Sequence, residues 1–194
     1  MYQGQLPSES GSNTRQKAKQ RIRSALHPQL AELWKQDLVA GIAFGSNPNV
    51  PKVAGRNPNE IAEHHKLANK GNHFYRFVPI VGERLGVACS LDILFLRRDS
   101  PGNLIQYGGD IDNRIKVLFD ALRIPQNPGE LPDGPPGPGE DPFHCLLEDD
   151  RFITSVKVTT DRLLTPLSHG EHTSDVLLVV GVKVVVTRAF PCIM

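Results

Sequence analysis

The stretch GDIDNRIKVLFDAL, residues 109–122, decides the predicted fold. Apolar side chains recur along it at steps of three and four residues, at Ile111, Ile115, Leu118 and Leu122. Residues at those steps line one side of an α-helix, so the pattern predicts an amphipathic helix whose apolar face packs on the core.

Two acids, Asp110 and Asp112, open this stretch. Two residues apart on one helix would point them roughly 200° from each other. They converge only if Asp110 lies before the helix, as its N-cap, while Asp112 occupies the first turn; Gly108 and Gly109 make such a break easy. A simpler interpretation is that Asp110 only caps a surface helix and that Asp112 forms an exposed ion pair with Lys116, four residues later.

A second acid cluster, Glu148 to Asp150, precedes the strand-like run RFITSVKV, residues 151–158. Alternate residues of a strand share a face, so Asp150 is predicted to lie on the more apolar face, with Phe152 and Val156. An acid at the mouth of an apolar face needs a cation or a metal as its partner. Carboxylates from both clusters are thus predicted to meet around a divalent ion.

These motifs together resemble the RusA-type Holliday-junction resolvases, which are small metal-dependent nucleases of phages and prophages. The resemblance covers roughly residues 86–160 and rests on Asp110-Ile111-Asp112-Asn113, Lys116, Asp120-Ala121-Leu122 and Asp149-Asp150. The connection between the helix and the second acid cluster is longer here than in the family. Tyr107-Gly108-Gly109 also replaces the basic residues that usually precede the first Asp.

The resemblance implies a Mg²⁺-dependent structure-specific endonuclease, acting in DNA recombination and repair as a homodimer on branched DNA. Asp110, Asp112 and Asp150 would be catalytic ligands of Mg²⁺, with Mn²⁺ as a substitute, because hard cations take carboxylate oxygens. Lys116 would be catalytic by reaching the scissile phosphate. Asn113 would orient a ligand, and Asp149 would bind the metal or support it. Asp120 is two turns beyond Asp112 and is interpreted as a surface or structural acid.

A basic helix is predicted to follow Asn13, to be interrupted by Pro28 and to continue in a second segment to Gln36. Its cations form either a solvated face or an arm that contacts nucleic-acid phosphates, and we favour the arm. Arg97 and Arg98 close a strand on the approach to Asp110, where they are either phosphate contacts or ordinary strand-end charges. The predicted nucleic-acid contacts are Arg15, Lys17, Lys19, Arg21, Arg23, Arg97 and Arg98.

The predicted architecture is α+β, a RusA-like mixed β-sheet with packed helices and an N-terminal helical extension. Residues 1–40 form the basic extension, beginning with a loose tail, and residues 41–194 form the nuclease domain. A Pro/Gly-rich insertion at 125–142 holds seven prolines and four glycines, too many for regular structure. Other predicted elements are a short helix from Asn57 to Gly71, β-runs at 73–81 and 86–97, and a strand covered on both faces at 175–187.

The net charge of +1 indicates that nucleic-acid contacts come from local clusters and not from the overall field. Three widely spaced cysteines suit a reducing cytosol, and no apolar run approaches the roughly 20 residues of a membrane span. We therefore expect a soluble cytoplasmic protein without membrane contact. The alternative function is a non-catalytic nucleic-acid-binding or partner-docking protein with the same fold.

Overall fold

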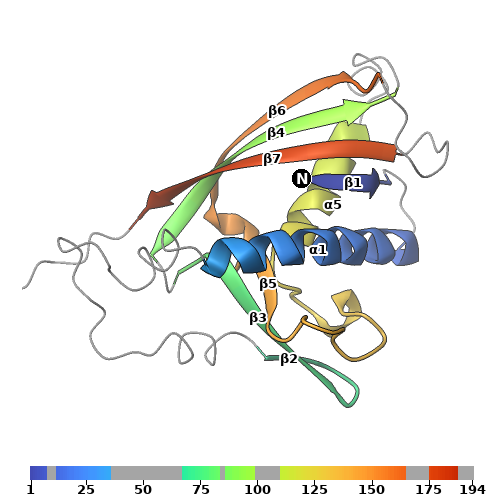
Figure 1. The fold of residues 1–194 in the computed structure, drawn as a ribbon, viewed down its shortest axis with the longest axis vertical. Coiled ribbons are helices and arrows are strands. Elements are labelled where there is room, and N and C mark those ends of the chain that lie inside the picture. Colours follow the sequence, from blue (N-terminus) through green and yellow to red (C-terminus); the bar gives the residue numbers. More distant parts are fainter. Residues whose placement is uncertain (8–11, 36–66, 84–85, 99–109, 165–174, 188–194) are drawn as a thin grey trace, which may run out of the picture.

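The computed structural model describes residues 1–7, 12–35, 67–83, 86–98, 110–164 and 175–187. Within these residues the fold is α+β, with two mixed β-sheets and the helices α1 (Ser12–Lys35) and α5 (Asp110–Leu122). The predicted fold class and mixed sheet are confirmed. Figure 1 shows α1 lying between the two sheets.

The larger sheet has the strand order β1-β7-β4-β6, formed by Tyr2–Gln5, Asp175–Val186, Val87–Arg97 and Ile153–Arg162. In it β4 pairs parallel to β6 and antiparallel to β7. The smaller sheet has the order β2-β3-β5, formed by Leu67–Lys70, His73–Val81 and Phe143–Leu147. The short 3₁₀ turns η1 (Pro128–Glu130) and η2 (Asp150–Phe152) precede β5 and β6.

Strand β4 is the centre of the core. Its alternate residues Val87, Cys89, Leu91, Ile93 and Phe95 are each at most 2% exposed, as the period-two pattern predicts. Helix α5 contributes the fully buried Leu118 to the same core cluster. The apolar faces of β4 and α5, which the sequence periodicity predicts, therefore pack in one hydrophobic core.

The N-terminal segment belongs to that core, which corrects the predicted loose tail and extension. Tyr2–Gln5 pair with β7, and Tyr2 and Leu6 are buried. Helix α1 runs through Pro28 without the predicted interruption. Its buried Ile22 and Leu26 pack on the core before the proline, and Leu30 packs beyond it. This packing on both sides outweighs the hydrogen bond that proline removes.

The prediction of a helix from Asn57 to Gly71 is wrong over its last residues. Leu67–Lys70 form β2, which joins β3 in an antiparallel hairpin. Gly71 lies in the connecting turn with φ of 58°, a conformation that glycine adopts without strain. Residues 57–66 lie outside the described part of the chain.

The C-terminal strand is covered over only part of its length. Val176 and Leu178 in β7 are fully buried, but Val186 is 65% exposed. Gly181 pairs with Asp92 in an unbroken register, so the β4–β7 ladder has no bulge there. The prediction of full coverage fails beyond the middle of the strand.

The Pro/Gly-rich segment 125–142 is irregular apart from η1, as predicted, but it is held in place. Lys70 pairs with Asp133 at 2.6 Å and Arg76 pairs with Asp141 at 2.7 Å. The imidazole Nε2 of His27 lies 2.9 Å from the carbonyl oxygen of Gly139, so the segment also contacts α1.

Candidate functional site

The first turns of α5 carry the first predicted group of site residues. Helix α5 begins at Asp110, so Asp110 is the first helical residue and does not precede the helix as predicted. Its side chain lies outside the described part. Asp112, Asn113 and Lys116 are all exposed. Among the described residues Asp112 and Lys116 make no ion pair, so the predicted surface pair is absent and both charges face solvent.

The second acid cluster is not on a strand. Asp150 opens η2, and β6 begins only at Ile153. Asp149 is the N-cap of η2, where its Oδ1 accepts a hydrogen bond from the backbone N–H of Arg151 at 3.0 Å. That hydrogen bond lowers the pKa of Asp149. A short acidic side chain that captures a nearby backbone N–H favours a turn over a strand, which explains why the predicted register of Asp150 is wrong.

The acid cluster lies beside the C-terminal end of α5. The N–H of Ile124 bonds to the carbonyl oxygen of Leu147 at 3.0 Å. The side-chain amide of Gln126 bonds to Asp149 Oδ2 at 3.4 Å. Asp112, by contrast, is in the first turn, ten residues before Leu122. At a rise of about 1.5 Å per residue, those ten residues span about 15 Å.

Within one chain Asp150 therefore lies towards the other end of α5 from Asp112, so these two predicted ligands are not brought together. The described residues hold no group of three or more His, Cys, Asp or Glu side chains that fits a metal ion. The physical reason is the crossover from β4 through α5 to the parallel strand β6. The helix runs back from the end of one strand to the start of the next, which separates the residues at its two ends.

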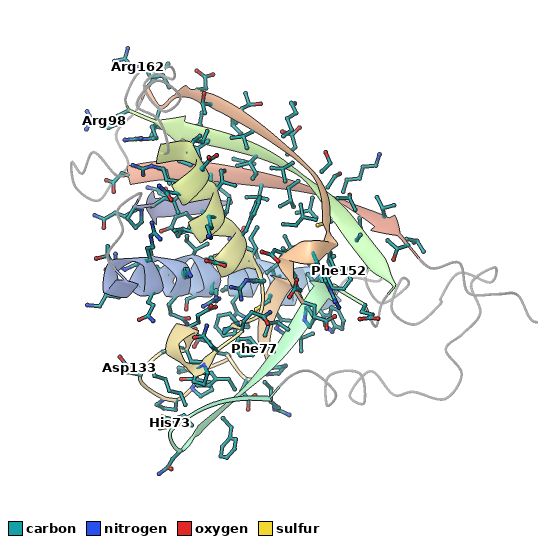
Figure 2. All side chains as sticks on the ribbon, turned by 180° about the vertical axis from the view of Figure 1, so that it is seen from behind. His73, Phe77, Arg98, Asp133, Phe152 and Arg162 are labelled. Carbon is teal, nitrogen blue, oxygen red and sulfur yellow. The ribbon has the colours of Figure 1, made fainter. Side chains whose placement is uncertain are left out.

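Basic residues gather at the end of the sheet where α5 begins. The last residues of the parallel strands, Arg97 and Arg162, lie in register. Figure 2 shows Arg98 and Arg162 close together at this end, with Phe152 far from them. Arg98 and Arg162 are exposed, but Arg97 is 8% exposed, so its prediction as a phosphate contact at the surface is wrong. Arg162 is not among the predicted contacts, because only the parallel pairing of β4 and β6 brings it to this end.

The predicted basic arm divides into buried and exposed cations. The guanidinium of Arg23, which is 2% exposed, donates to the backbone oxygen of Asp120 at 2.6 Å and to Glu130 Oε2 at 3.3 Å. Lys19 pairs with Asp120 Oδ2 at 2.7 Å. Lys19 and Arg23 are therefore structural cations, and their prediction as phosphate contacts is wrong. Lys17 and Arg21 are exposed, and Arg15 is half-buried.

Asp120 and Arg123 complete this ion network between α1, α5 and η1. Arg123 pairs with Asp120 Oδ1 at 2.7 Å and with Glu130 Oε1 at 3.3 Å. Burial raises the pKa of Asp120, but hydrogen bonds and charge from Lys19 and Arg123 outweigh burial and leave that pKa lowered. The interpretation of Asp120 as a structural acid agrees with this arrangement. The spacing of three residues between Asp120 and Arg123 is a sequence signal for this ion pair that was not used in the prediction.

The described cysteines are buried. Burial raises the pKa of the Cys89 thiol to about 11 and that of Cys145 to about 12. Both thiols are therefore protonated at neutral pH and are poor nucleophiles.

Among the described helices, none is long and apolar enough to cross a membrane. Comparison of the chain with protein-family models, with curated proteins and with solved structures finds no match. Its function must therefore be inferred from its own residues and their positions.

Proposed function

We propose that the protein is a Mg²⁺-dependent, structure-specific endonuclease that hydrolyses phosphodiester bonds in branched DNA as a homodimer. The observation that carries this proposal is the exposure of Asp112 and Lys116 on the first turns of α5, without an ion pair in the described residues. These are the residue types of the RusA-like motif, at its spacing. Arg98 and Arg162 lie at the same end of the sheet, where they suit the phosphates of a DNA strand.

One chain does not supply the donors that the motif needs for a metal ion, because Asp150 lies at the other end of α5. The proposal therefore requires Asp150 from a second copy. Where a two-fold axis is perpendicular to an element at the contact, the two copies of that element run antiparallel, so its start in one copy lies towards its end in the other. This symmetry brings Asp150 of the second copy towards the end of the sheet that carries Asp112.

Strand β6 offers an edge for such a contact. In the described part of the larger sheet β6 pairs only with β4, and Thr154–Lys157 are exposed. The edge of a sheet is a template for pairing with another chain. An antiparallel two-fold pairing centred on Thr159 sets Lys157 opposite Asp161 of the second copy, because each lies two residues from the centre. Opposite charges directly across two strands stabilise the pairing. Lys157 also pairs with Asp92 of its own chain at 3.1 Å, so the Asp161 of the second copy would share its charge.

This pairing also places Asp112 of one copy and Asp150 of the other at the same end of the sheet. In this pairing Arg162 lies opposite Val156 of the second copy. The start of β6 in that copy, which Asp150 precedes, then lies at the same end of the sheet as Arg162. A bound Mg²⁺ would supply charge stabilisation and an activated water. In this arrangement the carboxylates of Asp112 from one copy and Asp150 from the other would both bind that metal ion. The Lys116 ammonium, one turn beyond Asp112, reaches a phosphate oxygen there.

Cleavage of a fluorescent four-way DNA junction in Mg²⁺ tests this function. We expect the wild-type protein to cut, and we expect Asp112→Asn and Asp150→Asn each to reduce cutting at least a hundredfold. Asp141→Asn removes an exposed acid from the Pro/Gly-rich segment and should cut like the wild type. Cutting that survives Asp112→Asn would remove the proposed centre.

The separation of the acids within one chain is also what a non-catalytic nucleic-acid-binding protein would allow. That alternative predicts junction binding by the wild type with no cutting in Mg²⁺ or Mn²⁺. It also predicts that Asp150→Asn leaves junction affinity unchanged.

A further inference from the structure

A pocket lies between the N-terminal half of α1 and the segment that follows η1, and the motif residues do not contribute to it. Its volume is about 540 Å³. One wall consists of α1 residues at helical spacing, among them Lys17, Gln20, Arg21 and Ser24. Lys70 and the segment from Glu130 to Asp133 form the opposite wall. Figure 2 shows Asp133 below this half of α1.

The pocket is lined by more cations than its carboxylates neutralise. Glu130 is paired with Arg23 and Arg123, which lie outside the pocket lining. Asp133 is paired with Lys70 at 2.6 Å. In the described residues neither Lys17 nor Arg21 has an ion pair. Two exposed cations on adjacent turns of one helix thus line the cavity. The charge of Lys17 also contributes to the lowered pKa of Asp133, after the closer Lys70.

The remaining lining suits a nucleotide. The lining includes the amides of Gln16 and Gln20 and the hydroxyl of Ser24, which can donate and accept hydrogen bonds as sugar and base edges require. Gln20 now donates to Ser24 at 3.4 Å and Ser24 to Glu140 at 3.2 Å, so a ligand would exchange these bonds for its own. Leu131 and Pro132 add an apolar surface. The volume lies within the range of about 300–1,000 Å³ that small-molecule sites occupy. A single inorganic phosphate would leave most of it empty.

We propose that this pocket binds one phosphate-bearing nucleotide, with Lys17 and Arg21 on the phosphate and the amide side chains on the sugar and base. The nucleotide is either free or part of a nucleic-acid strand. Arg and Lys together neutralise phosphate charge, and polar side chains with an apolar wall hold the remainder. This site does not depend on the proposed nuclease, because no residue of the motif lines it.

Equilibrium binding in EDTA tests the proposal, since chelation of metal ions prevents metal-dependent cutting. Two probes are used with the full chain: dAMP by calorimetry and a labelled single-stranded DNA oligonucleotide by fluorescence anisotropy. The double variant Lys17→Gln/Arg21→Gln removes the cations. Gln20→Phe fills the pocket without changing charge. Lys183→Gln is the matched control, because Lys183 is an exposed lysine on β7.

We expect at least one probe to bind, with affinity reduced tenfold or more by the double variant and by Gln20→Phe, and changed less than twofold by Lys183→Gln. Binding of dAMP identifies a site for free nucleotides, and binding of the oligonucleotide alone identifies a strand site. Loss of affinity in the double variant with full affinity in Gln20→Phe would overturn the proposal that the nucleotide binds in this pocket. So would equal losses in the double variant and Lys183→Gln, or no binding of either probe.

The same assay separates this pocket from the proposed nuclease. If junction cutting fails while the pocket variants lose binding, the nuclease proposal falls and the nucleotide pocket stands.

Discussion

The two ends of α5 carry similar charged side chains in opposite surroundings. At the C-terminal end, Asp120 contacts Lys19 and Arg123 at 2.7 Å, within a network that includes the buried Arg23. At the N-terminal end, Asp112 and Lys116 are exposed and make no ion pair among the described residues. The difference separates charges that hold the helices together from charges that remain available to a ligand.

The largest effect should come from breaking the network. Arg23→Met removes a buried guanidinium and leaves the backbone oxygens of Asp120 and Glu130 without its hydrogen bonds. Removing one partner of a buried ion pair costs about 3–5 kcal/mol, and Arg123 still compensates Glu130, so we expect a loss of about 3 kcal/mol. Urea unfolding followed by circular dichroism measures it.

Arg21→Met is the matched control, because Arg21 is an exposed arginine on the same helix. It should change the unfolding free energy by no more than about 0.5 kcal/mol. Equal effects of the two substitutions would show that the network does not stabilise the fold.

A smaller effect should appear in the pH dependence of stability. The pKa of Asp120 in the folded protein lies below the ordinary value of an aspartate, because Lys19 and Arg123 donate to its carboxylate and outweigh its burial. Its ionised form therefore stabilises the fold above the unfolded-state pKa, and this contribution disappears as pH falls through the lower, folded-state pKa.

We expect the wild type to be more stable than Asp120→Asn at about pH 6, and this difference to shrink by about pH 2.5. Urea unfolding of both proteins across this range measures the difference. The pKa values of Asp133 and Asp149 are also lowered, so both proteins should lose stability in acid. A difference that stays constant down to the lowest pH would contradict the role given to Asp120.

The smallest effect should come from the N-terminal end of α5. Asp112→Asn and Lys116→Gln remove exposed charges, so each should change the unfolding free energy by no more than about 0.5 kcal/mol. Thermal unfolding at neutral pH tests this. A loss as large as that of Arg23→Met would mean that Asp112 is a structural acid.

The elements that the sequence predicts correctly are those in which local pattern and burial agree. The alternation along β4 and the helical spacing of Leu118 on α5 both end in the core. The continuous helix at Pro28 and the strand at the N-terminus were not predicted, because long-range packing determines the conformation of these residues. Tyr2 pairs with Leu178, 176 residues later, and no local pattern encodes that contact.

The site was predicted less well for a topological reason. Residue types and spacing predict Asp112, Lys116 and Asp150 as site residues, but the direction in which a helix connects two parallel strands decides whether they meet. Arg23 looks like a surface cation in the sequence, and only Glu130, 107 residues away, shows that it is buried. Arg162 joins Arg98 only through strand pairing. Side-chain chemistry was readable from the sequence, whereas the shared location of distant residues was not.

Mixing two inactive variants tests the central claim most directly. Asp112→Asn and Asp150→Asn proteins are unfolded and refolded together, so that mixed dimers form, and junction cutting is measured. If each centre takes Asp112 from one copy and Asp150 from the other, every mixed dimer holds one intact centre. Random pairing should then restore about one quarter of the wild-type number of centres. A mixture as inactive as each variant alone would contradict a centre shared between two copies.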